Sequence, residues 1–290
     1  MNYQKKLIVE PGRKVRLEDL DPDYHGKHES EGEARKESDE ALVELTALQR
    51  LLYGERKHAL LIVLQGIDAA GKDGVCWHII RAMNPQGTAV VGFKQPTAAE
   101  LAHDFLWRVH PHAPALGQVA VWNRSHYEDV LVARVHKLVS KSVWSARYDQ
   151  INEFERLLQA SGTTIVKFFL YISKEEQLKR FKERLDDPAR RWKISEGDYV
   201  ERKRWADYGS AFEDMLASCS TPQAPWYAIP SNHKWFRNLA VAQILRTTME
   251  DLGMKLPEPT LDLARIRREY HEAAEEEKGT GVPAAVKPAT

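Results

Sequence analysis

A glycine-rich loop between an apolar run and a helix-like segment constrains this chain more than any other feature. Residues 61–64 are apolar, and they lead into Gly66-Ile67-Asp68-Ala69-Ala70-Gly71-Lys72-Asp73-Gly74, after which helical apolar spacing follows through Ile80. A buried strand, a glycine loop and a helix in that order are typical of a phosphate-binding P-loop. Glycine lets the backbone approach a phosphate, N–H groups at the helix start point at its oxygens, and lysine adds a full charge. We therefore expect an oligophosphate site formed by Gly66, Ala69, Ala70, Gly71, Lys72, Asp73 and Gly74.

Two acidic residues distinguish this loop from the usual pattern. Asp73 stands where a P-loop normally has Ser or Thr, whose hydroxyl holds magnesium. Asp68 lies inside the loop, where phosphates would repel a carboxylate unless a divalent cation lay between them. We interpret Asp68 as a magnesium ligand or as a carboxylate that orients the acceptor group, and Asp73 as the cap of the following helix. The alternative is an ordinary strand–turn–helix connection with Asp68 in its turn.

Apolar runs and helical periodicity alternate along the chain. The expected strands are 61–64, 88–93, 118–122, 164–172 and 226–229. The expected helices are 33–53, 97–109, 125–135, 142–159, 174–185, 195–217 and 232–252. Strands separated by helices favour parallel pairing, helices on both sheet faces, and ligands at the carboxyl ends of the strands. The sequence therefore predicts an α/β fold with a five-stranded parallel sheet.

One folded domain accounts for most of the chain. Residues 1–32 are polar and predict an extended N-terminal arm, and residues 33–256 predict a single domain. Pro257 and Pro259 mark its end, and residues 257–290 read as a charged tail that is partly helical and partly disordered. The formal net charge of +0 argues against a globally basic nucleic-acid binder, so any grip on a polyanion must come from local clusters.

The cysteines and the termini indicate a cytoplasmic protein. Cys76 and Cys219 lie far apart and fit no metal-ligand spacing, so we expect both to be buried free thiols. No apolar run approaches membrane-spanning length, and residues 1–14 lack the apolar core of a signal peptide. We therefore expect no membrane partner and no nucleic-acid partner.

Polar residues follow the second and third expected strands at the points where these strands end. Arg124 comes just after the third strand, and its planar fork suits phosphate oxygens. Glu128 and Asp129 are either site carboxylates or caps of the next helix, and His126 is expected to pack or to hydrogen-bond rather than to bind metal. Lys94, after the second strand, either meets the acceptor's phosphate or is a solvated charge.

A basic segment follows the fourth strand. Residues 179–204 hold ten Lys and Arg against six Asp and Glu, and Pro188 breaks the helix in the middle. A hinged cationic segment is typical of a lid that closes over transferring phosphates, and we place it at about residues 184–200. Its candidate phosphate-binding residues are Arg184, Arg190, Arg191 and Lys193, with Trp192 either anchoring the closed lid or lying in the core. The alternative is a solvated helix face with ion pairs.

Together these features resemble the polyphosphate kinase 2 family, P-loop enzymes that move a phosphoryl group between inorganic polyphosphate and nucleotides. The resemblance covers about residues 30–256 and depends on four segments: 66–74, 93–97, 123–130 and the lid 184–193. Many members have Asp where this chain has Asn123, which shifts the expected metal role to Asp68 and Glu128. An Asn there looks like the class III branch, which is associated with phosphorylating both nucleoside monophosphates and diphosphates.

The resemblance implies a P-loop kinase fold with a helical lid, a thymidylate-kinase-like sheet order and a homo-oligomer, either dimer or tetramer. It implies transfer of the terminal phosphoryl group of polyphosphate to AMP and ADP with Mg²⁺, or with Mn²⁺ as the alternative metal. The implied catalytic residues are Asp68, Lys72, Arg124 and Glu128, with Asp68 and Glu128 as metal ligands. The loop and lid residues would bind polyphosphate, and Lys94, Asn123 and Arg124 would bind the nucleotide.

Two other functions use the same features differently. An ATP-dependent nucleotide kinase of the thymidylate-kinase-like type would place ATP on the same loop and would show no polyphosphate-dependent turnover. A non-catalytic phosphate- or RNA-binding module would bind without turnover and would give Asp68 no role.

Overall fold

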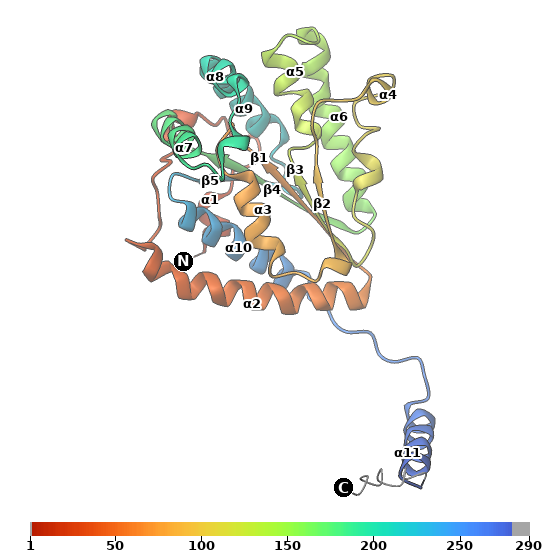
Figure 1. Ribbon diagram of the computed structural model, residues 1–290. Coiled ribbons are helices and arrows are strands. Elements are labelled where there is room, and N and C mark those ends of the chain that lie inside the picture. The colour runs from red at the N-terminus through yellow and green to blue at the C-terminus, as the bar shows by residue number, and fades with distance from the viewer. Residues whose placement is uncertain (1, 280–290) are drawn as a thin grey trace, which may run out of the picture. The chain divides into compact units, whose positions relative to one another are not determined.

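A five-stranded parallel sheet forms the centre of the protein (Figure 1). The computed structural model describes residues 2–279. The strands are β1 (Ala59–Gln65), β2 (Thr88–Gly92), β3 (Val119–Asn123), β4 (Thr163–Tyr171) and β5 (Trp226–Pro230). Their order in the sheet is β2-β3-β1-β4-β5, so β1 lies in the middle, and every one of its residues is buried. The predicted α/β fold and its parallel sheet are confirmed.

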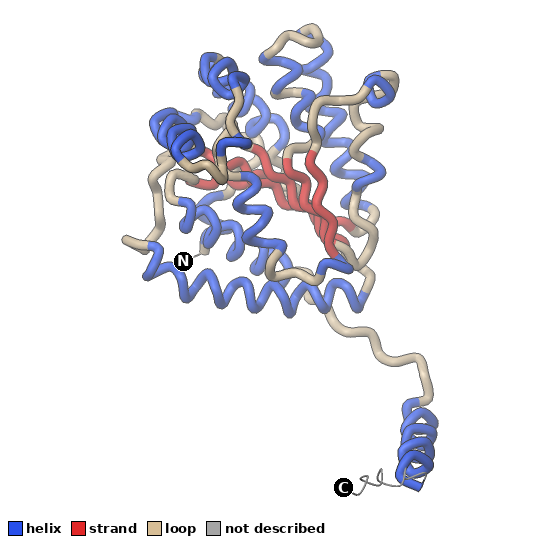
Figure 2. Tube along the Cα trace, viewed as in Figure 1, coloured by secondary structure: helices blue, strands red, loops and turns tan. Residues whose placement is uncertain are grey.

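Helices cover both faces of the sheet (Figure 2). On one face lie α2 (Glu31–Glu55), α3 (Lys72–Ile80) and α10 (Lys234–Asp251), and on the other lie α5 (Val132–Val135), α6 (Lys141–Ala160) and α9 (Trp205–Cys219). Successive strand residues point to opposite faces. Leu60 and Ile62 of β1 therefore pack in the first layer, whereas Leu61 and Val63 pack in the second. This two-sided burial explains the continuous apolar run of β1.

One of the expected helices is shorter than the periodicity suggested. In place of a helix over 97–109, α4 covers only Ala98–Leu101. The predicted capping box is present, because the hydroxyl of Thr97 accepts from the N–H of Glu100 and the carboxylate of Glu100 accepts from the N–H of Thr97. The carboxylate of Asp104 then accepts from the N–H groups of Leu106 and Trp107 and starts a turn instead of another helical turn.

Two further helices are interrupted. The segment expected as one helix over 125–135 forms the 3₁₀ helix η4 (His126–Asp129) and then α5, because Leu131 has φ −101° and ψ −80°, outside the helical region. The segment 195–217 forms α8 (Glu196–Lys203) and α9, with Arg204 between them in a non-helical conformation. The basic segment thus consists of α7 (Lys174–Asp186), the 3₁₀ helix η5 (Arg191–Lys193) and α8.

The N-terminal arm is not simply extended, which corrects the prediction for residues 1–32. It contains α1 (Tyr3–Leu7) and the 3₁₀ helix η1 (Leu17–Asp19). Tyr3 and Leu7, four residues apart, form one buried face, and the ring of Tyr3 packs edge-on against Phe236 at 5.4 Å. The N–H of Val9 then donates to the carbonyl of Trp226 at 2.8 Å. Burial of this apolar face against α10 stabilises a helix too short to form alone.

The C-terminal segment is a separate unit that begins at Leu256. Its helix α11 (Leu263–Gly279) coincides with the charged stretch that the sequence suggested could be helical. The part of the tail expected to be disordered, from residue 280 onward, lies outside the described residues. None of the helices in residues 2–279 is both long and apolar enough to cross a bilayer. Cys76 and Cys219 are buried free thiols, as predicted.

Candidate active site

The P-loop connects β1 to α3 and wraps around the side chain of its own lysine. Gly71 has φ +105° and Ala69 has φ +64°, so the loop turns through the left-handed region at two places. Lys72 folds back and its Nζ donates to the carbonyls of Gly66 at 2.6 Å and Ile67 at 3.3 Å. Burial, and secondarily the charge of Arg124, lowers the pKa of Lys72 to about 8. The ammonium group of Lys72 is therefore nearly buried and is held by carbonyls of its own loop.

The turn after β3 faces this loop, as expected if the third strand neighbours the first. The pairing of Leu64 with Asn123 puts the carboxyl ends of β1 and β3 side by side. Across this edge, Nη2 of Arg124 donates to Oδ1 of Asp68 at 2.8 Å, and Nη1 donates to Oε2 of Glu128 at 3.4 Å. Burial alone would lower the pKa of Arg124, but Glu128 and Asp68 raise it above its usual value.

The same turn carries backbone strain. Arg124 has φ +66°, a conformation that a residue with a side chain rarely adopts. Such strain persists only where the surrounding contacts determine it, and it is concentrated at functional sites. Here the N–H of Arg124 donates to the carbonyl of Leu64 at 3.1 Å, which keeps the turn against β1.

Asp73 does not cap α3, which corrects the sequence prediction. Gly71 is the N-cap residue, and no side chain caps the helix there. Instead, Oδ1 of Asp73 accepts from the amide of Asn123 at 2.8 Å and Oδ2 pairs with Nζ of Lys193 at 3.2 Å. Burial would raise the pKa of Asp73, but these two partners hold it below its usual value. Asp73 thus joins the start of α3, the end of β3 and the lid.

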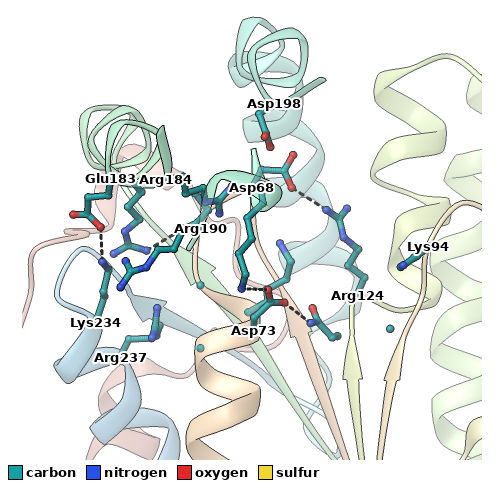
Figure 3. A pocket seen from close by; sticks show the side chains of 18 of the residues that line it. Asp68, Asp73, Lys94, Arg124, Glu183, Arg184, Arg190, Asp198, Lys234 and Arg237 are labelled. Carbon is teal, nitrogen blue, oxygen red and sulfur yellow. Dashed lines mark hydrogen bonds and ion pairs between the residues drawn. The ribbon is translucent and has the colours of Figure 1, made fainter. Parts of the chain in front are cut away.

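A cavity of about 640 Å³ opens above the loop and is lined mainly by charged residues (Figure 3). The predicted site residues on its wall are Asp68, Ala69, Gly71, Lys72, Asp73, Gly74, Lys94, Asn123, Arg124, Arg184, Arg190 and Lys193. The other predicted residues do not line it. The carbonyl of Gly66 accepts from Lys72, and that of Ala70 accepts from Arg180. Glu128 contacts Arg124, and Arg191 donates to the carbonyl of Leu185 at 2.9 Å. Trp192 is 77% exposed, so it is not a core residue.

Sequence reasoning missed two buried arginines beneath the loop. Arg180 of α7 donates from Nη1 to the carbonyls of Ala69 and Ala70, from Nη2 to those of Ser231 and Asn232, and from Nε to Glu176. These five bonds match the five N–H donors of a guanidinium group. Arg180 therefore joins the P-loop, the base of the lid and the segment after β5. In the sequence, Arg180 lies in a run of basic residues, and nothing there distinguishes it from neighbours that are exposed to solvent.

The second is Arg237 of α10, whose Nη1 lies 3.4 Å from the carbonyl of Ala70. It follows Trp235 and Phe236, and the apolar run 239–242 begins two residues later, so a cation close to these apolar residues is the one signal that could have identified it. Three further charged residues that the sequence did not identify line the cavity: Glu183, Asp198 and Lys234.

A buried polar network supports the turn that carries Arg124. The hydroxyl of Tyr127 donates to Glu155 at 2.7 Å, and Nζ of Lys167 donates to Tyr127 at 2.9 Å and to Glu155 at 2.5 Å. Burial would raise the pKa of Glu155, but Lys167 and His126 together more than offset this, so the pKa stays below its usual value. His126 packs against the rings of Trp122 and Tyr127, as expected, and burial lowers its pKa.

The side chains of the described residues limit how many protein ligands a metal ion could have. Within residues 2–279, no group of three or more His, Cys, Asp or Glu side chains could hold a metal ion. Magnesium usually takes one or two protein carboxylates and completes its shell with water and substrate phosphates. Asp68 and Glu128, both of which contact Arg124, could provide the one or two carboxylates of such a magnesium site.

Comparison with known proteins places the chain in a family. The sequence profile described as Polyphosphate kinase 2 (PPK2) matches residues 28–257. An AMP/ADP-polyphosphate phosphotransferase of Meiothermus ruber is 48% identical over 256 residues, which cover 88% of this chain and 96% of that protein. An ADP-polyphosphate phosphotransferase of Rhodopseudomonas palustris is 43% identical over 272 residues, covering 88% and 93%. The crystal structure of polyphosphate kinase 2 from Arthrobacter aurescens matches with a TM-score of 0.90 at 39% identity and covers 94% of this chain and 97% of that one. The chain therefore belongs to the polyphosphate kinase 2 family.

Proposed function

We propose that this protein transfers the terminal phosphoryl group of inorganic polyphosphate to nucleoside monophosphates and diphosphates, with AMP and ADP as acceptors. The observation that carries this proposal is the 2.8 Å contact between Asp68 and Arg124 inside a cavity lined by more cations than carboxylates. It joins a donor loop to the strand-end turn that would hold the acceptor. The relatives named above are an AMP/ADP-polyphosphate phosphotransferase and an ADP-polyphosphate phosphotransferase, which supports the same reaction and does not favour an ATP donor.

In this reaction the protein positions phosphates and neutralises their charge. Lys72 and the loop N–H groups would hold the donor near the transfer point, and Arg184, Arg190 and Lys193 would hold the rest of the chain as the lid closes. An acceptor phosphate oxygen attacks the terminal phosphorus in line with the leaving oxygen, so one P–O bond forms as another breaks and the shortened polyphosphate leaves. Positioning and charge stabilisation suffice for such a step, and no covalent intermediate is needed.

The acceptor would lie on the side of β2 and β3. Lys94 and Arg124 provide cations there, and Asn123 provides an amide that already donates to Asp73. A divalent cation, for which we propose magnesium with manganese as the alternative, would be held by Asp68 and Glu128 and would offset repulsion between phosphates.

We also propose a homo-oligomer, either dimer or tetramer, in the cytoplasm. Two buried free cysteines support a reducing compartment. Light scattering of the purified full chain measures the oligomeric state, and a monomer at micromolar concentration would contradict it.

One assay tests the central proposal. AMP, ADP, GMP and GDP are supplied separately with magnesium and long-chain polyphosphate, and the nucleotide products are identified. We expect ADP and ATP from the adenine acceptors. Turnover with ATP as the phosphoryl donor and none with polyphosphate would favour the thymidylate-kinase-like alternative, and binding without turnover would favour a binding module.

A further inference from the structure

Arg237 is a buried cation whose charge is not compensated by the protein. Its side chain belongs to the first turn of α10, and the residue is 4% exposed. Nε and Nη2 donate to Oδ1 of Asn238 at 3.2 Å and 2.9 Å, and Nη1 makes the long contact with Ala70. These acceptors are neutral. None of the ion pairs in the described part of the chain includes Arg237.

The surroundings increase the cost of this charge. Burial, and secondarily the nearby cation of Arg180, lowers the pKa of Arg237 to about 9. Arg180 makes its own ion pair with Glu176 at 2.8 Å, so that carboxylate is already engaged. A buried charge without a counter-charge is unfavourable, and groups in such environments are typical of functional sites.

Arg237 also lies directly against the P-loop. A Cβ atom built on Gly71 would lie 1.9 Å from Nη1 of Arg237, and one built on Gly74 would lie 3.0 Å from Nη2. The two glycines therefore leave the space that the guanidinium group fills. The guanidinium group has five N–H donors and makes three hydrogen bonds, so it can donate to another acceptor.

The cavity wall around Arg237 carries further cations. Lys234, one turn earlier on α10, and Arg184 and Arg190 of the lid line the same cavity. In Figure 3, Arg237 and Lys234 lie on one side of Asp73, whereas Arg124 and Lys94 lie on the other. Lys234 pairs with Glu183 at 2.8 Å and Arg190 pairs with Asp187 at 2.9 Å, whereas Arg184, like Arg237, has no ion pair within residues 2–279. The cavity thus continues past the loop, away from the acceptor side, along a wall with more cations than anions that a chain of phosphates could follow.

We propose that Arg237 binds a phosphate of the donor chain beyond the transferred group and that this phosphate supplies the counter-charge that the protein lacks. The inference rests on the proposed function, because it takes polyphosphate as the donor. Arg237 then binds the phosphoryl donor and raises the affinity of the protein for polyphosphate. In the protein without polyphosphate, its uncompensated charge lowers the free energy of unfolding. A purely structural Arg237 would instead support the loop through Ala70, and its removal would weaken the fold with no selective effect on the donor.

The test compares Arg237→Met with wild type and with Arg246→Met. Arg246 lies on the same helix but pairs with Glu44 of α2 at 3.1 Å, away from the cavity. Each full-length protein is melted with and without long-chain polyphosphate, and KM is measured separately for polyphosphate and for AMP. For Arg237→Met we expect an unliganded Tm equal to or above that of wild type, because replacing an uncompensated buried charge with an apolar side chain is neutral or stabilising.

We further expect Arg237→Met to lose most of the rise in Tm that polyphosphate causes in wild type. Its KM for polyphosphate should increase about tenfold or more, while KM for AMP stays within about twofold. Arg246→Met should keep the wild-type response to polyphosphate in both measurements. If Arg237→Met does not fold, Arg237→Gln, which can still reach Asn238, is measured in the same way.

A lower unliganded Tm combined with an unchanged polyphosphate shift and unchanged KM values would overturn the proposal and leave a structural role. The two hypotheses fail separately. If wild type is stabilised by polyphosphate but transfers no phosphoryl group, the proposed function falls, and the thermal shifts of the variants still test Arg237. If wild type turns over and the Arg237 variants bind polyphosphate as wild type does, only the role of Arg237 falls.

Discussion

Lys167 and Glu155 form a buried ion pair, and we expect the removal of either partner alone to cost much more than the removal of both. Their charged atoms lie 2.5 Å apart, and the two side chains are 0% and 2% exposed. At an effective dielectric constant of about 20, the attraction at this distance is about 7 kcal/mol. Desolvation costs several kcal/mol for each ion, so the net contribution of the intact pair is small.

A double-mutant cycle with Lys167→Met and Glu155→Gln measures this balance. Met resembles the methylene stem of lysine, and Gln still offers an oxygen to the hydroxyl of Tyr127. Each single variant leaves one buried group without its partner and should lower the free energy of unfolding by about 3–5 kcal/mol. Because the net contribution of the intact pair is small, the double variant should lose less stability than either single variant, which corresponds to a coupling energy above about 3 kcal/mol.

Urea denaturation followed by tryptophan fluorescence gives the four free energies of unfolding. The matched control is the exposed pair of Arg156 and Glu153 on the same helix α6, whose side chains are 73% and 67% exposed. Its cycle should give a coupling energy below about 1 kcal/mol. If the losses at Lys167 and Glu155 add to within about 0.5 kcal/mol, the pair is not coupled and the reasoning is refuted.

Three further predictions concern the P-loop. Asp68→Asn and Lys72→Ala should each lower the rate of polyphosphate-dependent transfer by about a hundredfold or more, with an unchanged circular dichroism spectrum. The control Asp39→Asn, on the exposed face of α2, should leave the rate unchanged. Near-normal activity of either loop variant would contradict the assignment. Gly71→Ala would place a Cβ atom at a residue with φ +105° and only 1.9 Å from Nη1 of Arg237. It should therefore lower the free energy of unfolding, measured by urea titration, by more than about 1 kcal/mol. Wild-type stability of this variant would contradict the packing argument. Lys72 is charged below its pKa of about 8 and neutral above it. For this reason kcat/KM for polyphosphate, which reports the free enzyme, should fall between about pH 7 and pH 9, and a flat profile would refute the assigned role.

The sequence predicted the sheet well because strand signals are local. The apolar runs predicted all five strands to within two residues at each end, with the largest difference at the start of β1, which begins at Ala59. The glycine loop identified the position of the phosphate site, since only a tight turn before a helix accounts for Gly66, Gly71 and Lys72 together. Polar residues at the ends of β2 and β3 were recognised as site candidates by the same local reasoning.

Helix ends and the N-terminal arm were predicted less well, because they depend on competition between local and tertiary contacts. Asp104 and Arg204 interrupt helices whose apolar periodicity continues past them. Tyr3 and Leu7 form a helix only because α10 buries their shared face. Asp73 lies in the first turn of α3, where an acidic residue could cap the helix, yet its carboxylate accepts from Asn123 and pairs with Lys193 instead.

The sequence by itself determined which residues form the strands and the phosphate loop, because backbone conformation at glycine and the alternation of apolar residues are encoded within a few positions. Only the tertiary structure decided that β3 lies beside β1 and brings Arg124 to Asp68, since strand order follows from the packing of layers and not from spacing. It also decided that Arg180 is fully paired whereas Arg237 is not. Whether a charge is compensated depends on every group packed around it, and those groups come from α7, the P-loop and α10, which lie far apart in the chain.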